Sequence, residues 1–216
     1  MSSLLDKPAT ELVNTFSKGI GMPGSGCVAA LSALSATHLL VSVCKLTTTK
    51  ERYKEVHDEI SRIQTELETT YIPRLAAVID EDAAAVKEML RYRIQRDKES
   101  DEQKKNELQQ KAQEGLKNAT DTMMGLCATC LDIIPMALEV YNIGLKSAKG
   151  DTAVVLSNLL SGASSGLYTV LINIKTAKEQ EWTTGLKPDI ETFFGRLHEY
   201  QYIFNGKLET LYNKAR

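Results

Sequence analysis

Apolar residues recur every three or four positions along most of this chain, the spacing that places them on one face of an α-helix. The last part of the chain shows the pattern most clearly, with apolar positions at Ile190, Phe193, Leu197, Tyr200, Phe204, Leu208 and Leu211. No segment of useful length alternates apolar and polar residues as a half-buried β-strand does. The pattern therefore predicts an all-α protein.

Capping residues, glycines and prolines divide this pattern into long helices. We expect a loop around Asp97–Asp101, an end or kink at Pro73 and a kink near Pro135. The expected helices are residues 8–17, 25–46, two stretches within 50–92 on either side of Pro73, one from about 102 to 149, 151–178 and 188–212. Together they predict a single-domain bundle of long helices comprising residues 1–216.

The segment from Ser25 to Leu46 is apolar enough to raise the question of a membrane. It approaches the ~20 residues that a transmembrane helix needs. Several polar side chains would then face lipid: Ser32, Ser35, Thr37, His38 and Ser42. A buried central helix, whose small residues let neighbouring helices approach closely, explains the segment better. We therefore expect no membrane contact.

The composition is that of an ordinary globular chain. Of its 216 residues, 43% are hydrophobic and 25% are charged, and the formal net charge is -2. Because nucleic acids and anionic membranes are held by basic surfaces, we expect neither as a partner. Four cysteines without a secretory leader predict free thiols in a reducing compartment, the cytoplasm.

A glycine-rich turn, GIGMPGSGCVAALSAL, covers residues 19–34. Its G-x-G-x-x-G spacing matches a dinucleotide fingerprint, but that motif follows a strand, and the preceding segment here has a helical pattern. A phosphate loop needs Lys and then Ser or Thr after its last glycine, where this chain has Cys27 and Val28. Two interpretations remain. The N-terminus of the buried helix holds an anion or a carbonyl oxygen, or the turn only connects two helices.

Four segments, in order along the chain, resemble the signatures of the cyclodeaminase/cyclohydrolase family of folate enzymes. They are MPGSGCVAAL (22–31), KLTTTKERY (45–53), VIDEDAAAV (78–86) and GDTAVVLSNLLSGASSGLYTVLINI (150–174). Each signature alone is weak, but the ordered set is specific and spans most of residues 15–180.

The resemblance implies an all-helical homodimer with a site for a reduced folate that carries a one-carbon unit. It implies closure of 5-formimino-tetrahydrofolate to the 5,10-methenyl form with loss of ammonia, hydrolytic opening of that methenyl form, or both. It also implies that neither a metal nor a redox cofactor is needed.

The chain departs from the family signatures at three positions near the expected site. Ser25 stands where the family turn has glycine, Cys27 where it has serine, and Val86 where it has an aromatic residue. The changes at Ser25 and Cys27 favour an alternative, a cyclodeaminase-fold dimer that binds or acts on a different ligand without folate turnover.

The resemblance carries catalytic roles onto acidic residues. Its third segment places a carboxylate on Asp82, with Asp80 as the second choice, and its fourth places one on Asp151. Residues two apart on a helix point in different directions, so at most one of Asp80 and Asp82 faces the centre. A fixed carboxylate stabilises the cation that forms on ring closure, and a second group moves protons. A solvated charge run at 80–82 and an ordinary helix N-cap at Asp151 are the alternatives.

Further candidates are expected to contact the ligand: Gly24, Ser25, Gly26, Cys27, Lys50 and Asn173. The glycines let backbone N–H groups approach a pterin oxygen or a carboxylate. Lys50 suits the carboxylates of a folate glutamate tail. Asn173 lies in an apolar stretch, where its amide needs a partner on a neighbouring helix or on the pterin edge.

No metal site is expected. Cys127-Ala-Thr-Cys130 lacks the second pair that a zinc site of this type has, and on a helix its two sulfurs share a face, as core residues do. The three histidines show no ligand spacing. Cys27 differs from the other cysteines because a thiol at a helix N-terminus can have a lowered pKa.

Overall fold

The computed structural model describes residues 3–19, 23–177 and 180–216, and these contain helices and no strand. The α-helices are α1 (Ala9–Thr15), α2 (Ser25–Thr48), α3 (His57–Glu66), α4 (Ile72–Lys98), α5 (Glu102–Ile143), α6 (Lys149–Ala177), α7 (Glu181–Gly185) and α8 (Lys187–Ala215). The connecting turns are η1 (Leu4–Asp6), η2 (Glu51–Val56), η3 (Leu67–Tyr71) and η4 (Lys146–Ala148). The all-α bundle is confirmed, whereas the assignment of residues 1–216 to one domain stays a prediction.

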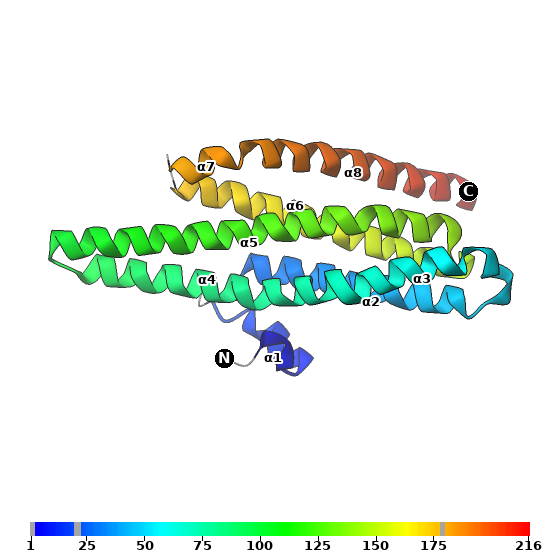
Figure 1. The fold of residues 1–216 in the computed structure, drawn as a ribbon, viewed down its shortest axis with the longest axis horizontal. Coiled ribbons are helices and arrows are strands. Elements are labelled where there is room, and N and C mark those ends of the chain that lie inside the picture. The colour runs from blue at the N-terminus through cyan, green and yellow to red at the C-terminus, as the bar shows by residue number, and fades with distance from the viewer. Residues whose placement is uncertain (1–2, 20–22, 178–179) are drawn as a thin grey trace.

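The long helices run alternately in opposite directions along one axis (Figure 1). α2, α4, α5 and α6 form the bundle, α8 lies along α6 and α5, and the short α1 lies to the side near the N-terminus (Figure 1). Arg196 ties α8 to α5 by donating hydrogen bonds to the Leu131 carbonyl and the Asp132 carboxylate. Since α2 and α6 are antiparallel, the start of α6 lies at the end of the bundle where α2 finishes (Figure 1).

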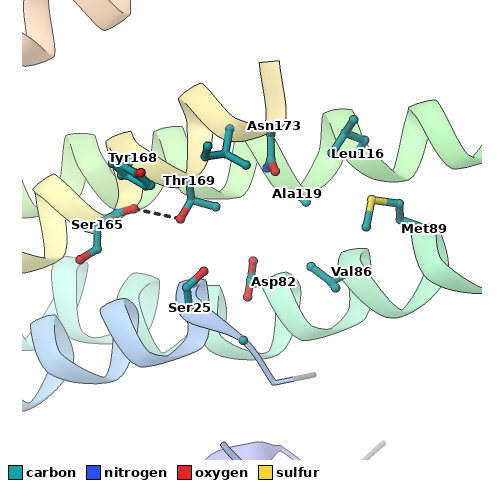
Figure 2. A pocket seen from close by; sticks show the side chains of 13 residues that line it. Ser25, Asp82, Val86, Met89, Leu116, Ala119, Ser165, Tyr168, Thr169 and Asn173 are labelled. Carbon is teal, nitrogen blue, oxygen red and sulfur yellow. Dashed lines mark hydrogen bonds between the residues drawn. The ribbon is translucent and has the colours of Figure 1, made fainter. Parts of the chain in front are cut away.

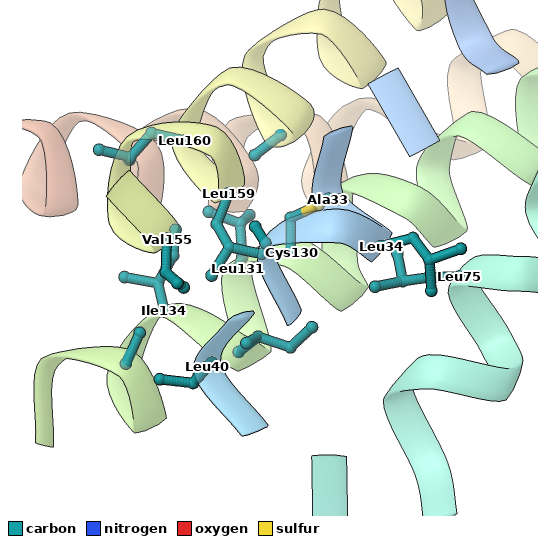
Figure 3. Packing of buried hydrophobic residues seen from close by; sticks show 14 of the residues in the cluster. Ala33, Leu34, Leu40, Leu75, Cys130, Leu131, Ile134, Val155, Leu159 and Leu160 are labelled. Carbon is teal, nitrogen blue, oxygen red and sulfur yellow. The ribbon is translucent and has the colours of Figure 1, made fainter. Parts of the chain in front are cut away.

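The core is built from aliphatic, small and sulfur-containing side chains of α2, α4, α5 and α6 (Figure 3). Leu40, Ile134 and Leu159 are among those with almost no exposed surface. Gly162 permits close packing of α6, because a Cβ there would lie 3.0 Å from Cys130 Sγ and 3.3 Å from Ala33 Cβ. All four cysteines are free and buried, so the Cys127/Cys130 pair packs in the core as expected.

Neither Pro73 nor Pro135 ends the helical stretch that contains it, and the kink expected near Pro135 stays a prediction. Pro73 lies in the first turn of α4, where a missing N–H costs little, and the π-helical turn η3 joins α3 directly to α4. α5 continues through Pro135 and ends at Ile143, short of the expected end near Lys149. α6 then begins at Lys149, so Asp151 lies within its first turn and is not its N-cap.

Within the described residues, three segments are long and apolar enough, by length and composition alone, to cross a membrane: Ser25–Thr48, Glu102–Ile143 and Lys146–Ala177. Half or more of the most apolar stretch of each is buried inside the protein. Packing between helices thus accounts for much of this apolarity, and the absence of membrane contact stays a prediction.

Candidate functional site

A pocket of about 550 Å³ lies where the N-terminus of α2 meets α4, α5 and the second half of α6 (Figure 2). This volume is within the usual range for small-molecule sites. It brings together five of the residues that the sequence singled out: Gly24, Ser25, Gly26, Asp82 and Asn173. The other lining residues are Val86, Met89, Leu116, Ala119, Ser165, Tyr168, Thr169 and Ile172.

Asp82 is the one buried carboxylate among the described residues, with 4% of its surface exposed. It projects from α4 against the first turn of α2, where backbone N–H groups lack partners within their own helix. Glycine at position 26 makes this approach possible, because a Cβ there would lie 2.6 Å from Cγ and from both oxygens of Asp82. The glycine turn therefore serves to bring a helix N-terminus onto a carboxylate.

Cys27 lies behind Asp82 and does not line the pocket. It is fully buried, and its thiol lies 3.3 Å from Asp82 Oδ2 and 3.3 Å from the Ile79 carbonyl oxygen, so it can donate to either. Burial and the nearby Asp82 charge raise the pKa of Cys27 to about 12. The lowered pKa suggested by its place at a helix N-terminus is therefore wrong, because desolvation outweighs the helix dipole. Cys27 therefore remains a protonated thiol that can donate a hydrogen bond to Asp82.

Burial also raises the pKa of Asp82, and the hydrogen bonds from the Cys27 thiol and backbone offset this only in part. A carboxyl group whose pKa is raised holds its proton closer to neutral pH, as a group that transfers protons must. The carboxylate at the base of the pocket is thus suited to exchange a proton with a bound molecule.

The raised pKa of Asp82 leads to a prediction about stability. The folded protein holds this proton more tightly than the unfolded chain, so wild-type stability falls as pH rises from about 4, the unfolded value, through the raised folded pKa. Asp82→Asn carries no ionisable group there. Its melting temperature relative to wild type is expected to increase with pH across this window. Thermal unfolding of both proteins between pH 4 and 8 measures the trend, and a difference independent of pH would contradict it.

Asn173 and Asp82 lie on opposite walls of the pocket, on α6 and α4 (Figure 2). Among the described residues, the Asn173 side chain makes no hydrogen bond, so its amide is available to a ligand. Ser25 is exposed at the pocket rim, beside Gly24. Gly21 of the glycine turn lies outside the described residues.

The structure places Asp80, Lys50 and Asp151 away from this pocket. Asp80 accepts a hydrogen bond of 2.8 Å from the Leu4 backbone N–H and so holds η1 against α4. Lys50 is exposed just beyond the far end of α2, and Asp151 is exposed at the start of α6. Asp151 lies about 33 Å from Asn173, by the rise of the helix that they share.

The part of the chain that the structure describes contains no cluster of acidic, histidine or cysteine side chains suited to a metal site. No group of three or more such side chains is placed to hold a metal ion there.

The sequence model of the formiminotransferase-cyclodeaminase family matches residues 8–192. The chain belongs to this family. Over 199 residues it is 27% identical to the methenyltetrahydrofolate cyclohydrolase of Methylorubrum extorquens, covering 89% of this chain and 94% of that protein. Over 208 residues it is 24% identical to the formimidoyltransferase-cyclodeaminase of Sus scrofa, covering 96% of this chain but only 38% of the pig protein.

The fold is also that of a solved structure. The crystal structure of formiminotetrahydrofolate cyclodeaminase from Thermotoga maritima matches with a TM-score of 0.83 at 19% identity, covering 97% of this chain and 99% of that one. The helical bundle is thus shared along nearly the whole length of both chains.

In this member of the formiminotransferase-cyclodeaminase family, α6 supplies pocket residues that the sequence did not single out. Ser165, Tyr168 and Thr169 form a hydroxyl-bearing wall, although the Thr169 hydroxyl donates to the Ser165 carbonyl of its own helix (Figure 2). The sequence feature that could have identified these residues is the spacing of hydroxyl-bearing side chains, three or four positions apart on an otherwise apolar helix. On the opposite wall, Val86 and Met89 of α4 add apolar surface beside Asp82.

Proposed function

We propose that the protein is a folate one-carbon enzyme. It closes 5-formimino-tetrahydrofolate to 5,10-methenyl-tetrahydrofolate with release of ammonia, hydrolyses the methenyl form, or does both. Membership of the formiminotransferase-cyclodeaminase family and the names of the two curated relatives support this proposal. The observation that carries it is the buried Asp82 carboxylate, held at the base of the pocket by a helix N-terminus.

The chemistry assigns Asp82 two tasks. N10 of the folate attacks the formimino carbon and forms the new C–N bond, and the C–N bond to the formimino nitrogen breaks. The formimino group reacts in its protonated amidinium form. Asp82 accepts the proton that N10 loses and passes it to the formimino nitrogen, which then leaves as ammonia. Its negative charge stabilises the delocalised methenyl cation that remains. In the hydrolytic reaction, Asp82 accepts a proton from the water that attacks the methenyl carbon and passes it to the ring nitrogen whose bond to that carbon breaks. The second water proton is released to solvent, and formyl-tetrahydrofolate remains.

The pocket walls suit a pterin. The apolar side chains of Val86, Met89 and Leu116 offer contact to flat ring faces. The Asn173 amide offers both a donor and an acceptor to the ring edge, and the first turn of α2 offers N–H groups. Among the described residues, Asp82 is the only charged one in the lining, so a cationic product meets one fixed negative charge.

The decisive experiment is incubation with 5-formimino-tetrahydrofolate while methenyl absorbance and ammonia are followed together. Equal amounts of both products establish the cyclodeaminase reaction, and loss of absorbance from added methenyl-tetrahydrofolate establishes the hydrolase reaction. The departures at Ser25 and Cys27 favour the alternative of a different ligand. A folate-dependent rise in melting temperature without turnover would support binding alone. The absence of both turnover and a rise in melting temperature would reject the folate proposal.

Cys27 is expected to set the pH dependence of this reaction through Asp82. A serine hydroxyl is a better hydrogen-bond donor than a thiol, so Cys27→Ser stabilises the charged carboxylate and lowers its pKa. Cys27→Ala removes the donor and raises that pKa. Because the basic form of Asp82 starts the reaction, the acidic limb of the kcat profile should move to lower pH in the serine variant. It should move to higher pH in the alanine variant. Identical limbs in all three proteins would contradict this role.

We also propose that the protein is a cytoplasmic homodimer that acts without a metal or redox cofactor, away from membranes and nucleic acids. The motive for the dimer is the long, one-sided apolar helices and the family resemblance. Sedimentation at micromolar concentration tests it, and a monomer throughout would count against it. Full activity after dialysis against a chelator is expected.

A further inference from the structure

The pocket has a polar end and an apolar end (Figure 2). Asp82 of α4 lies at the polar end, and Ser165 and Thr169 line the α6 wall there. Met89 and Leu116 lie at the other end. Since the flat faces of a pterin fit apolar side chains, a folate bound this way places its one-carbon group at the polar end, between α4 and α6.

The hydroxyl group of Thr169 already uses its proton in a hydrogen bond within α6. Thr169 Oγ1 donates this bond of 2.9 Å to the carbonyl oxygen of Ser165, one turn earlier in the helix. The bond fixes one of the two rotamers that threonine adopts in a helix. The oxygen keeps its lone pairs, and Figure 2 shows it directed into the pocket. Toward a ligand, Thr169 is therefore an acceptor of hydrogen bonds.

Two hydrogen-bond acceptors face the polar end of the pocket from opposite walls. Asp82 in its basic form has no proton to donate, and Thr169 donates its own to Ser165. A ligand group with two N–H bonds satisfies both acceptors at once. A carbonyl oxygen in the same place satisfies neither, because its lone pairs oppose those of Thr169, and an acceptor withdrawn from water without a donor costs free energy. The polar end therefore suits a nitrogen that carries hydrogens.

We propose that Thr169 selects a protonated amidine nitrogen over a carbonyl oxygen in the one-carbon group of the ligand, an inference that rests on the proposed folate function. The amidinium form of the formimino group ends in NH2, so one hydrogen meets Thr169 while the other is directed toward Asp82. The bond to Thr169 keeps this nitrogen within reach of the proton that Asp82 passes to it before ammonia leaves. The formyl group of 5-formyl-tetrahydrofolate has a similar size but ends in oxygen, so Thr169 disfavours it.

Two folates of similar size test this selection. Turnover of 5-formimino-tetrahydrofolate gives kcat/KM, and 5-formyl-tetrahydrofolate added as an inhibitor gives Ki. Thr169→Val replaces the hydroxyl group by a methyl group of about the same size. The variant should lower kcat/KM about tenfold or more, because a hydrogen bond to a charged group is lost. It should leave Ki for the formyl compound unchanged or lower it, because the opposing oxygen is gone.

Two further variants separate the hydroxyl group from the rest of the side chain. Thr169→Ser keeps the hydroxyl group and its bond to the Ser165 carbonyl, so both constants should stay near their wild-type values. Thr176→Val is the matched control, because Thr176 is exposed on α6 outside the pocket and donates the same kind of bond, 2.8 Å long, to the Ile172 carbonyl. It should change neither constant.

A loss of kcat/KM in Thr169→Val with an equal rise in Ki would give Thr169 a merely structural role and overturn the proposal. A rise in Ki alone would show that the hydroxyl group donates to the ligand, and would overturn it too. Wild-type turnover that Thr169→Val leaves intact would reject the selection but not the folate function.

Thermal shift with the same two compounds covers a wild type that binds folates without turnover. Thr169→Val should then reduce the shift given by the formimino compound and not that given by the formyl compound. Equal shifts in the variant and the wild type would reject the selection. A wild type that binds neither compound would reject the folate function and the selection together.

Discussion

Replacing Asp82 by asparagine is expected to lower kcat for methenyl formation by about a hundredfold or more while KM changes little. Asparagine keeps the size of the side chain and can still accept a hydrogen bond from Cys27. It cannot take up the N10 proton, and it brings no negative charge to the methenyl cation. The loss therefore belongs to the transition state and not to binding.

Asp80→Asn is the matched control for this experiment, because Asp80 lies two residues away on the same helix and contacts Leu4 outside the pocket. It should keep near wild-type kcat and lose, at most, some stability at η1. Steady-state kinetics of the two variants, with folate binding followed separately by thermal shift, gives the comparison. Near wild-type kcat in the Asp82→Asn variant would exclude Asp82 as the catalytic carboxylate.

The change of Gly26 to alanine is expected to reduce kcat nearly as much as the change of Asp82 itself. The added Cβ would lie 2.6 Å from every atom of the Asp82 carboxyl group, so that group must leave its place on the α2 N-terminus. Overpacking of this kind costs about 1–3 kcal/mol of stability. Turnover should thus fail through displacement of Asp82 and not through loss of a glycine turn as such.

Gly206→Ala on α8 is the control, because nothing lies within 4 Å of a Cβ at that position. It should leave activity unchanged and raise stability by up to about 1 kcal/mol, since alanine is the better helix former. The double variant Gly26→Ala/Asp82→Ala makes the test specific. With the carboxyl group gone, alanine at position 26 should lower the free energy of unfolding much less than it does in the wild-type background. Additive costs in this cycle would show that the clash with Asp82 is not the cause.

The sequence predicted the parts of this protein that depend on local pattern. Apolar spacing in residues 188–212 predicted α8, and the glycine turn before residue 25 predicted where α2 begins. These features are local, because helix periodicity and termini depend on residues a few positions apart. Pro73 shows the limit of this reasoning, because it lies in the first turn of α4 and the π-helical turn η3 continues the helix before it.

The chemistry of Cys27 could not be obtained from local pattern. Its place at a helix N-terminus favours a lowered pKa, but the packing of α4 over it removes water and sets Asp82 beside it. Both effects raise the pKa, and both come from the packing of α4, a helix distant in the chain. Because of the same packing, Cys27 is a hydrogen-bond partner of Asp82 and does not line the pocket.

By itself, the sequence determined the helical class, the helix termini near the site and the family signatures that single out Asp82, because each depends on neighbouring residues. Only the tertiary structure decided which candidates share a pocket. It placed Asp82, Gly26 and Asn173 around one space and left Asp151 at the opposite end of α6. The reason is geometric: the order of motifs along a chain does not contain the distances between antiparallel helices, and those distances arise only when side chains such as Ala33 and Cys130 pack across Gly162.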